Sequence, residues 1–118
     1  MIREGLVVLV PFPYVEAGAP GKVRPAVVVR RLPGDYDDWL VCMVSSRVDQ
    51  AIKGFDEVVS ARDDDFAGSG LKVSSVIRIS RLAVCHGSAL LGSIGRLDAR
   101  RLSRIRSRLS DWLGDEPT

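Results

Sequence analysis

Short apolar segments separated by turn residues fill the first two-thirds of the chain. Each is rich in Val, Leu or Ile and is bounded by Gly, Pro, Asp or Ser, the pattern typical of β-strands. The predicted strands are Leu6–Val10, Ala26–Arg30, Trp39–Val44, Phe55–Val59, Ser75–Ile79 and Ala89–Ile94. Leu32–Asp38 is predicted to be a turn and Asp63–Gly70 a loop. Many short strands with frequent turns favour a small β-barrel over an alternating βα sheet.

The pattern changes to a helical one after Asp98. Apolar residues recur at i, i+3, i+7 and i+10, which makes one stripe of an α-helix: Leu102, Ile105, Leu109 and Trp112. Asp98 is the predicted N-cap, and Leu97 can pack on Leu102 as a hydrophobic staple. Gly114 is predicted to end the helix. The chain therefore reads as mainly β with one C-terminal helix.

Charge is distributed unevenly along the chain. Residues 1–65 hold 8 basic and 11 acidic side chains, whereas residues 66–118 hold 9 basic and 4 acidic ones. Arginine supplies 14 of the 17 basic residues, and its planar fork suits phosphate recognition. Five arginines cover the predicted helix outside its apolar stripe: Arg100, Arg101, Arg104, Arg106 and Arg108. Two interpretations remain open for this face, contact with nucleic acid or simple solvation.

Residues Gly5–Val29 combine two apolar runs with a Gly/Ala/Pro loop that ends in Lys-Val-Arg-Pro. This arrangement places Lys22 and Arg24 at the mouth of a loop that buried strands brace on both sides. Pro25 forces Arg24 into an extended backbone, so its guanidinium is presented from a fixed direction. A cation held in this way can grip a phosphate. The alternative is a hairpin whose loop carries two basic residues by chance.

Length and composition restrict the remaining possibilities. We expect one domain over residues 1–118, with a barrel at about 5–95 and a helix at about 98–113. No apolar run approaches the ~20 residues that span a bilayer, and the N-terminus does not resemble a signal peptide. We therefore expect a cytoplasmic protein without membrane contact. Cys42 and Cys85 lie among apolar residues and are expected in the core, and with His86 they form no known metal pattern.

Three stretches together resemble the MazF/PemK family of toxin endoribonucleases from bacterial toxin–antitoxin systems. They are GLVVLVPFPY with GKVRPAVVV, then VCMVSSR at Val41–Arg47, and finally SSVIRISRL at Ser74–Leu82 running into GSIGRLDARRLSRIRSRL. The resemblance extends from about Gly5 to Leu113. It implies an SH3-like β-barrel with a C-terminal helix, a homodimer, and RNA bound near the dimer interface.

The resemblance also implies a metal-free cleavage of RNA that requires no cofactor. The ribose 2′-OH attacks its own 3′-phosphate, which leaves a 2′,3′-cyclic phosphate and a 5′-OH. The catalytic residues then fall on Arg24, Ser45 and Arg78. Ser45 could instead satisfy backbone at a strand end, and Arg78 could be an ordinary exposed strand arginine. Residues expected to bind RNA are Lys22, Pro25, Ser46, Arg47 and Ser80.

The departures from the family pattern concern the general base. Some members carry an Asp two residues after the second arginine, where this chain has Ser80, and the histidine of the first loop in some members is replaced by Gly/Ala/Pro. Histidine is the side-chain type best suited to proton transfer near neutral pH, but the single histidine, His86, matches no family position. Because the pKa of arginine exceeds about 12, we assign Arg24 to charge stabilisation before proton transfer.

Two hypotheses follow from these residues. The first is a sequence-specific endoribonuclease toxin that acts on single-stranded RNA such as mRNA and is neutralised by an acidic antitoxin. The second is a non-catalytic SH3-like barrel that binds RNA or a protein partner. Lys22, Arg24, Pro25 and Ser45 favour the first hypothesis. The missing Asp at position 80 favours the second.

Overall fold

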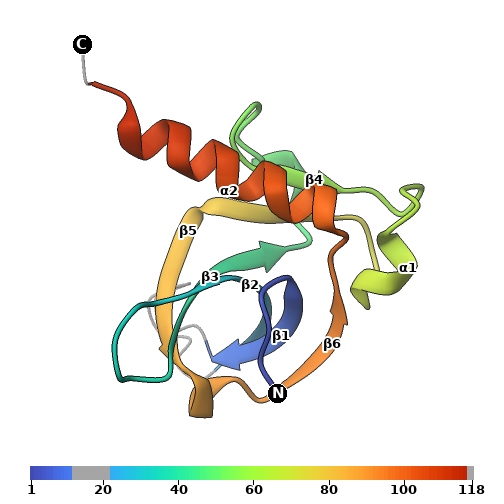
Figure 1. Ribbon diagram of the computed structural model, residues 1–118. Helices are drawn as coiled ribbons and strands as arrows, with labels where there is room; N and C mark the ends of the chain where they lie inside the picture. The colour runs from blue at the N-terminus through green and yellow to red at the C-terminus, as the bar shows by residue number, and fades with distance from the viewer. Residues whose placement is uncertain (12–21, 117–118) are drawn as a thin grey trace.

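Six antiparallel strands form one curled sheet in the computed structural model, which describes residues 1–11 and 22–116. The strands are β1 (Leu6–Pro11), β2 (Val23–Arg31), β3 (Asp38–Ser45), β4 (Glu57–Val59), β5 (Ser75–His86) and β6 (Gly92–Arg96). Their order across the sheet is β4-β5-β3-β2-β1-β6. The sheet bends round on itself into a half-barrel, and helix α2 (Ala99–Gly114) lies across it (Figure 1). The predicted fold class is confirmed. Most of the Gly/Ala/Pro loop lies outside the described residues.

Strand β2 begins at Val23 instead of Ala26, strand β4 begins at Glu57 instead of Phe55, and three other predicted segments are wrong in their extent or type. Strand β5 continues to His86 instead of ending at Ile79, because β3 supplies partners as far as the pair Asp38–His86. The predicted strand at Ala89–Ile94 is a 3₁₀ turn, η2 (Gly87–Ala89), followed by β6. The predicted loop at Asp63–Gly70 contains a short helix, α1 (Phe66–Ser69), which Gly70 ends at a φ of 74°.

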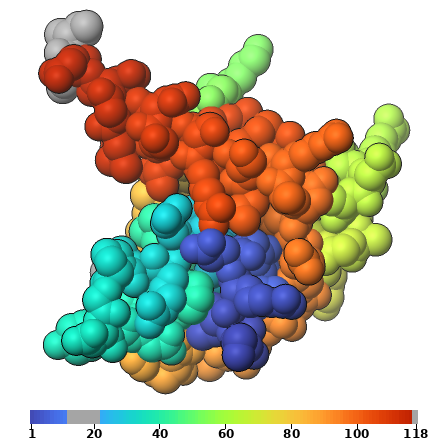
Figure 2. Space-filling model, in the orientation of Figure 1, coloured from blue at the N-terminus to red at the C-terminus, as the bar shows by residue number. Residues whose placement is uncertain are grey.

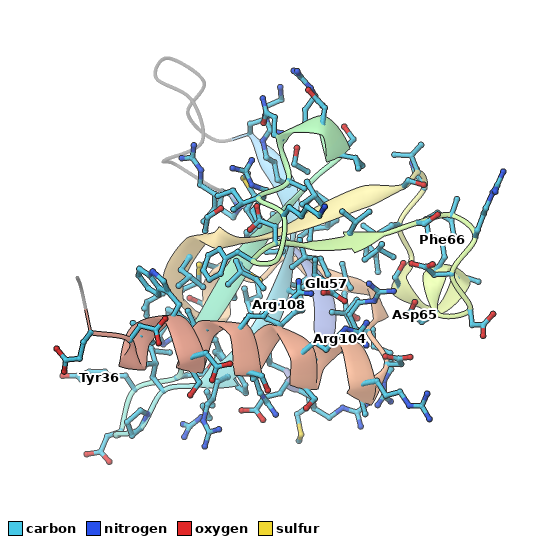
Figure 3. All side chains as sticks on the ribbon, turned by 90° about the horizontal axis from the view of Figure 1, so that it is seen from above. Tyr36, Glu57, Asp65, Phe66, Arg104 and Arg108 are labelled. Atoms are coloured by element: carbon cyan, nitrogen blue, oxygen red, sulfur yellow. The ribbon has the colours of Figure 1, made fainter. Side chains whose placement is uncertain are left out.

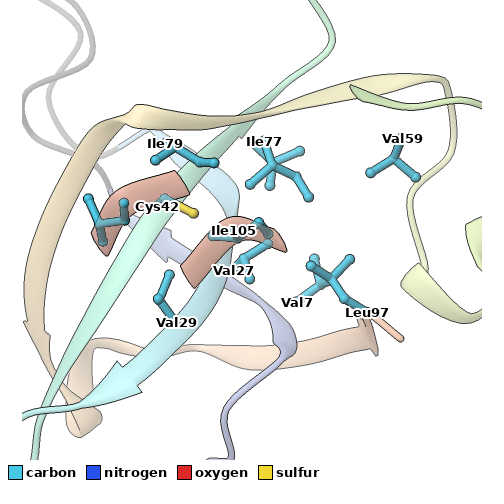
Figure 4. Packing of buried hydrophobic residues seen from close by; sticks show 11 residues of the cluster. Val7, Val27, Val29, Cys42, Val59, Ile77, Ile79, Leu97 and Ile105 are labelled. Atoms are coloured by element: carbon cyan, nitrogen blue, oxygen red, sulfur yellow. The ribbon is translucent and has the colours of Figure 1, made fainter. Parts of the chain in front are cut away.

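Two apolar clusters cover the two faces of the sheet, as the alternation of side chains along a strand requires. Val27, Cys42 and Ile77 belong to the first cluster, which includes Ile105 and Leu109 of α2. Figure 4 shows this cluster enclosed by the strands with α2 against it. Ala26, Val41, Met43 and further residues form the second cluster on the opposite face. Cys42 is fully buried, as predicted, and burial raises the pKa of its thiol to about 12.

Helix α2 begins as its sequence predicts. The Asp98 side chain accepts a hydrogen bond of 2.8 Å from the backbone N–H of Arg101. Trp112, at the end of the apolar stripe, is 57% exposed and contacts Phe55 with ring centroids 5.9 Å apart. Gly114 is the last helical residue, but the helix ends without a left-handed cap, because Asp115 continues in extended backbone. In the space-filling view α2 forms a ridge above the N-terminal residues (Figure 2).

Carboxylates from residues 1–65 bind several arginines of α2. Arg101 is 6% exposed and contacts Glu57, Asp63 and Asp65 at 3.1, 3.0 and 2.8 Å. Arg104 and Arg108 also reach Glu57, at 2.7 and 2.8 Å (Figure 3). Neither sequence interpretation of this face fits these three arginines, because they pair with the protein's own acidic residues. The acidic side chains of residues 1–65 and the arginines of α2 thus partly neutralise each other within the fold.

Close backbone contacts explain the glycine of the Ile-Gly-Arg-Leu motif. A Cβ at Gly95 of β6 would overlap the carbonyl oxygen of Gly68 and the backbone of Ser69 in α1. A Cβ at Gly70 would overlap the carbonyl of Ile94. Helix α1 therefore packs directly on β6, where no larger residue fits.

Within the described residues, no helix is long and apolar enough to cross a membrane.

Candidate functional site

The sheet register gathers three predicted site residues on neighbouring strands. Ala26 of β2 pairs with Met43 of β3, and one step of two residues places Arg24 opposite Ser45. Met43 also pairs with Arg78 on β5. Because side chains alternate with a period of two, Arg24, Ser45 and Arg78 point to the same face of the sheet. This face is opposite the one that α2 covers.

A bulge in β5 adds another cation to this group. The pairing of β5 with β3 jumps from Arg78 to Leu82, so residues 79–81 have no counterpart on β3. In a regular strand, Arg78 and Arg81 would point to opposite faces. Bulges re-aim side chains, and here both arginines line the same pocket. This is why the sequence reasoning missed Arg81.

The resulting arginine pocket has a volume of about 260 Å³. Its lining residues are Arg24, Met43, Ser45, Arg47, Gln50, Arg78 and Arg81. Four of these seven are arginines and none is acidic. Such a concentration of guanidinium groups favours an anion with several acceptor oxygens, such as a phosphodiester.

Hydrogen bonds and ion pairs orient several of these side chains. Ser45 Oγ accepts a hydrogen bond of 3.1 Å from the backbone N–H of Arg47. A hydroxyl can accept and donate at once, so this strand-end role leaves its proton available. Arg47 is exposed and pairs with Asp49 at 3.2 Å. Arg78 is 9% exposed, and its Nη1 donates to Gln50 Oε1 at 3.4 Å. The alternative of an ordinary exposed strand arginine is therefore wrong for Arg78.

A buried carboxylate that the sequence did not indicate lies behind the arginine pocket. The Asp56 side chain is 0% exposed, and its Oδ2 lies 3.3 Å from Arg78 Nε. Its Oδ1 accepts hydrogen bonds of 3.2 Å from both the backbone N–H and the Oγ of Ser80. Asp56 is 22 positions before Arg78 in the sequence, and no local motif connects the two.

A second cavity, the apolar-walled pocket, adjoins the first and has a volume of about 450 Å³. Both pockets include Arg24 and Ser45 in their lining. The other lining residues are Leu9, Lys22, Val23, Pro25, Val44, Ser46, Gly70, Leu71, Lys72, Val73, Ser75 and Ile94. The lining is thus mostly apolar, with two lysines and several hydroxyls. The sequence reasoning did not find the segment 70–73, because it follows α1 and carries no recognisable motif.

Most predicted site residues are brought to these two pockets. Lys22, Pro25 and Ser46 line the apolar-walled pocket, and Arg47 lines the arginine pocket. Ser80 lines neither of them, and its hydroxyl is directed to Asp56. Ser80 is exposed on β5, two residues after Arg78, so it lies at the protein surface but outside the lining of both pockets, and its expected contact with RNA stays a prediction.

His86 and the cysteines lie away from both pockets. The His86 ring is exposed, and its Nδ1 lies 2.9 Å from Ser88 Oγ. Cys42 and Cys85 are both free thiols, the first buried and the second half-buried. In residues 1–11 and 22–116, no group of three or more His, Cys, Asp or Glu side chains could hold a metal ion. The chemistry that the described site offers is that of guanidinium and hydroxyl groups acting on an anion.

Comparisons with known proteins agree with this architecture. An endoribonuclease from a mycobacterial species, in complex with its cognate antitoxin, matches with a TM-score of 0.68 at 10% identity, covering 100% of both chains. A MazE–MazF structure from Deinococcus radiodurans has a TM-score of 0.67 at 22% identity, covering 98% of this chain and 97% of that one. The Mycobacterium tuberculosis toxin MazF-mt6 has a TM-score of 0.65 at 15% identity, covering 95% and 99%.

At these low sequence identities, the structural matches establish a shared fold. The family is shown by a separate comparison. No curated protein sequence matches the chain significantly. The model of the PemK-like, MazF-like toxins of type II toxin–antitoxin systems, however, matches residues 3–113. The resemblance that the three sequence stretches suggested is confirmed, and with it the class of enzyme expected, an endoribonuclease. The chain belongs to the PemK-like, MazF-like toxin family of type II toxin–antitoxin systems.

Proposed function

We propose that this protein cleaves single-stranded RNA, such as mRNA, by attack of a ribose 2′-OH on the adjacent 3′-phosphate. The observation that carries the proposal is the arginine pocket, where Arg24, Arg78 and Arg81 converge around Ser45. In the reaction, the O2′–P bond forms and the P–O5′ bond breaks. The proton of the 2′-OH passes to solvent water, and the departing 5′-oxygen takes a proton from solvent water. The products are a 2′,3′-cyclic phosphate and a 5′-OH.

The lining residues act on the charge that builds up at phosphorus. Arg24 and Arg78 donate to the non-bridging oxygens of the phosphorane, and the Ser45 hydroxyl donates a neutral hydrogen bond. Donors held in place before the reaction stabilise a transition state without reorganisation. No described lining residue of this pocket is a histidine or a carboxylate. The contribution that we assign to the arginines is therefore electrostatic.

The apolar-walled pocket suits the nucleoside next to the reacting phosphate. Leu9, Pro25 and Ile94 offer apolar surface on which a base can rest, while Lys22 and Lys72 suit a neighbouring phosphate. Because Arg24 and Ser45 line both pockets, one strand of RNA can occupy both with its scissile phosphate between them. We propose that Lys22, Pro25 and Ser46 bind RNA in this way, and that Arg47 does so at the rim of the arginine pocket.

We further propose that the protein acts in the cytoplasm as a homodimer and that an acidic antitoxin covers these cationic pockets. Exposed apolar residues support an interface at the apolar-walled pocket: Val23, Val73 and Ile94 belong to its lining, and the backbone N–H of Leu91 binds Leu9 of that lining. Sedimentation at micromolar concentration should give twice the chain mass of 12.9 kDa. An acidic partner that enters the pockets should abolish cleavage. A monomer at that concentration, or an antitoxin complex that still cuts RNA, would contradict these two points.

The proposed reaction is tested with a defined single-stranded RNA in excess EDTA. We expect cleavage at a restricted set of sites, because the two pockets constrain both a phosphate and its neighbouring base. End mapping should find 2′,3′-cyclic phosphate on one product and 5′-OH on the other. Cleavage that EDTA abolishes, or 5′-phosphate products, would contradict this mechanism.

One observation favours a different candidate, a barrel that binds RNA without cutting it. The described lining of the arginine pocket lacks a residue that ordinarily moves a proton near neutral pH. The same RNA, labelled for fluorescence anisotropy, separates the two candidates. An RNA that binds in a salt-dependent manner and stays intact over hours identifies the binding module.

A further inference from the structure

We infer that Asp56 is a positioning residue that fixes the guanidinium of Arg78 for the reaction, an inference that rests on the proposed function. Asp56 contributes no atom to the lining of either pocket. Its carboxylate instead forms an ion pair with Arg78 at 3.3 Å from Nε, a buried nitrogen that makes no hydrogen bond of good geometry. The carboxylate thus contacts the inner edge of the guanidinium, while the outer part of Arg78 lines the arginine pocket.

The contacts of Asp56 hold its carboxylate in one orientation. Oδ2 accepts a hydrogen bond of 2.9 Å from the backbone N–H of Ile52, and Oδ1 accepts two from Ser80 at 3.2 Å. The side chain is completely buried. A carboxylate fixed from both sides can in turn fix the arginine that it contacts.

Arg78 needs such an anchor because of where it stands in the sheet. It is the last residue of β5 before the bulge at residues 79–81, where the regular ladder no longer constrains the chain. Ser80 belongs to that bulge, and both its N–H and its hydroxyl bind Asp56. Asp56 therefore ties the bulge and the arginine together.

Glu57 is a matched control for the structural importance of this segment. It follows Asp56 directly and is equally buried, at 5% exposure for each residue. Its carboxylate faces the opposite way and binds arginines of α2. Glu57→Gln therefore weakens the same segment without touching Arg78, whereas Asp56→Asn removes the charge beside Arg78.

The first experiment compares kcat and KM of Asp56→Asn and Glu57→Gln on a short fluorogenic RNA. A misplaced catalytic group costs up to about 100-fold, so we expect Asp56→Asn to lower kcat by about 10- to 100-fold with little change in KM. Glu57→Gln should keep kcat within about threefold at a temperature where both variants are folded. In the Arg78→Ala background, Asp56→Asn should cost less than about threefold, because residues that act together are not additive. An equal cost in both backgrounds would overturn the inference.

A second measurement does not depend on cleavage. In ¹⁵N spectra, the Arg78 Nε–H should exchange slowly with water, because it is buried beside a carboxylate. We expect that protection to be lost in Asp56→Asn and kept in Glu57→Gln. If the wild-type protein cuts no RNA, the proposed function fails while this measurement still decides the role of Asp56. Unchanged protection in Asp56→Asn would refute that role even in an active enzyme.

Discussion

Arg24→Ala is expected to lower kcat/KM for single-stranded RNA by at least about 10²–10³, the usual loss for one well-placed donor to a developing oxyanion. Arg24 lines both pockets and stands next to Pro25 at the start of β2, so its direction is fixed by backbone as well as by packing. Arg24→Lys should recover little activity, since an ammonium cannot reproduce the planar fork. Initial rates of cleavage on a defined RNA measure both effects.

Arg47→Ala is the matched control for charge. Arg47 also lines the arginine pocket, but its side chain is 64% exposed and paired with Asp49. An exposed ion pair contributes little, so we expect less than about a tenfold loss, mostly in KM.

Ser45→Ala should lower the cleavage rate about tenfold, as expected for the loss of a neutral donor. Equal activity of Arg24→Ala and the wild-type protein would refute the assigned role of Arg24.

Local pattern was sufficient to predict most of the fold. The strand cores follow from short apolar runs bounded by turn residues, the helix follows from a period of 3.6 residues, and Asp98 caps α2 as its position indicates. The errors arose where tertiary partners decide the outcome. In the second half of β5, residues such as Leu82 and Val84 are exposed. This half of the strand is therefore held by its backbone pairing with β3 and not by a buried apolar face that the sequence could reveal. Helix α1 is four residues long, too short for a periodic signal.

The site was predictable where a residue reaches the pocket directly from a regular strand. Arg24 and Ser45 meet because β2 and β3 are neighbours in register, which a hairpin between consecutive strands makes predictable. Arg81 and Asp56 were missed for a physical reason. The first depends on a bulge that changes the face of its side chain, and the second contacts Arg78 across 22 positions of sequence. Neither effect leaves a local signature in composition or spacing.

The arginines of α2 show how a charge pattern can be misread. Their spacing on one helix suggested either a solvated face or a contact with nucleic acid. The structure instead places Glu57, buried to 6% side-chain exposure, among Arg101, Arg104 and Arg108. A buried carboxylate must be paired, so these arginines, and the buried Arg101 above all, have a structural role in the fold. The cations that we propose to bind RNA are instead those that line the two pockets.

Arg101→Met is therefore expected to have the largest effect on stability of any arginine substitution in α2. Arg101 is 7% exposed as a side chain and binds three carboxylates and the backbone oxygen of Val58. Removing one partner of a buried ionic network costs about 3–5 kcal/mol, because the remaining charges are left uncompensated. Thermal or urea unfolding measures this loss. Arg104→Met is the matched control, since Arg104 shares Glu57 but is 49% exposed, and it should cost less than about 1 kcal/mol.

The same network fixes how the cost of Arg101→Met depends on pH. Hydrogen bonds from Arg101 hold the pKa of Asp65 below its usual range. The pKa of an aspartate in the unfolded chain is about 3.9. A carboxyl whose pKa is lower in the folded state contributes its full stability above that unfolded pKa, and this contribution is lost as pH falls through the folded pKa. The difference in unfolding free energy between the wild-type protein and Arg101→Met should therefore be largest at neutral pH and should shrink below about pH 4. A difference that stays constant from pH 7 to pH 3 would show that Arg101 stabilises the fold by packing of its alkyl chain and not through its carboxylate partners.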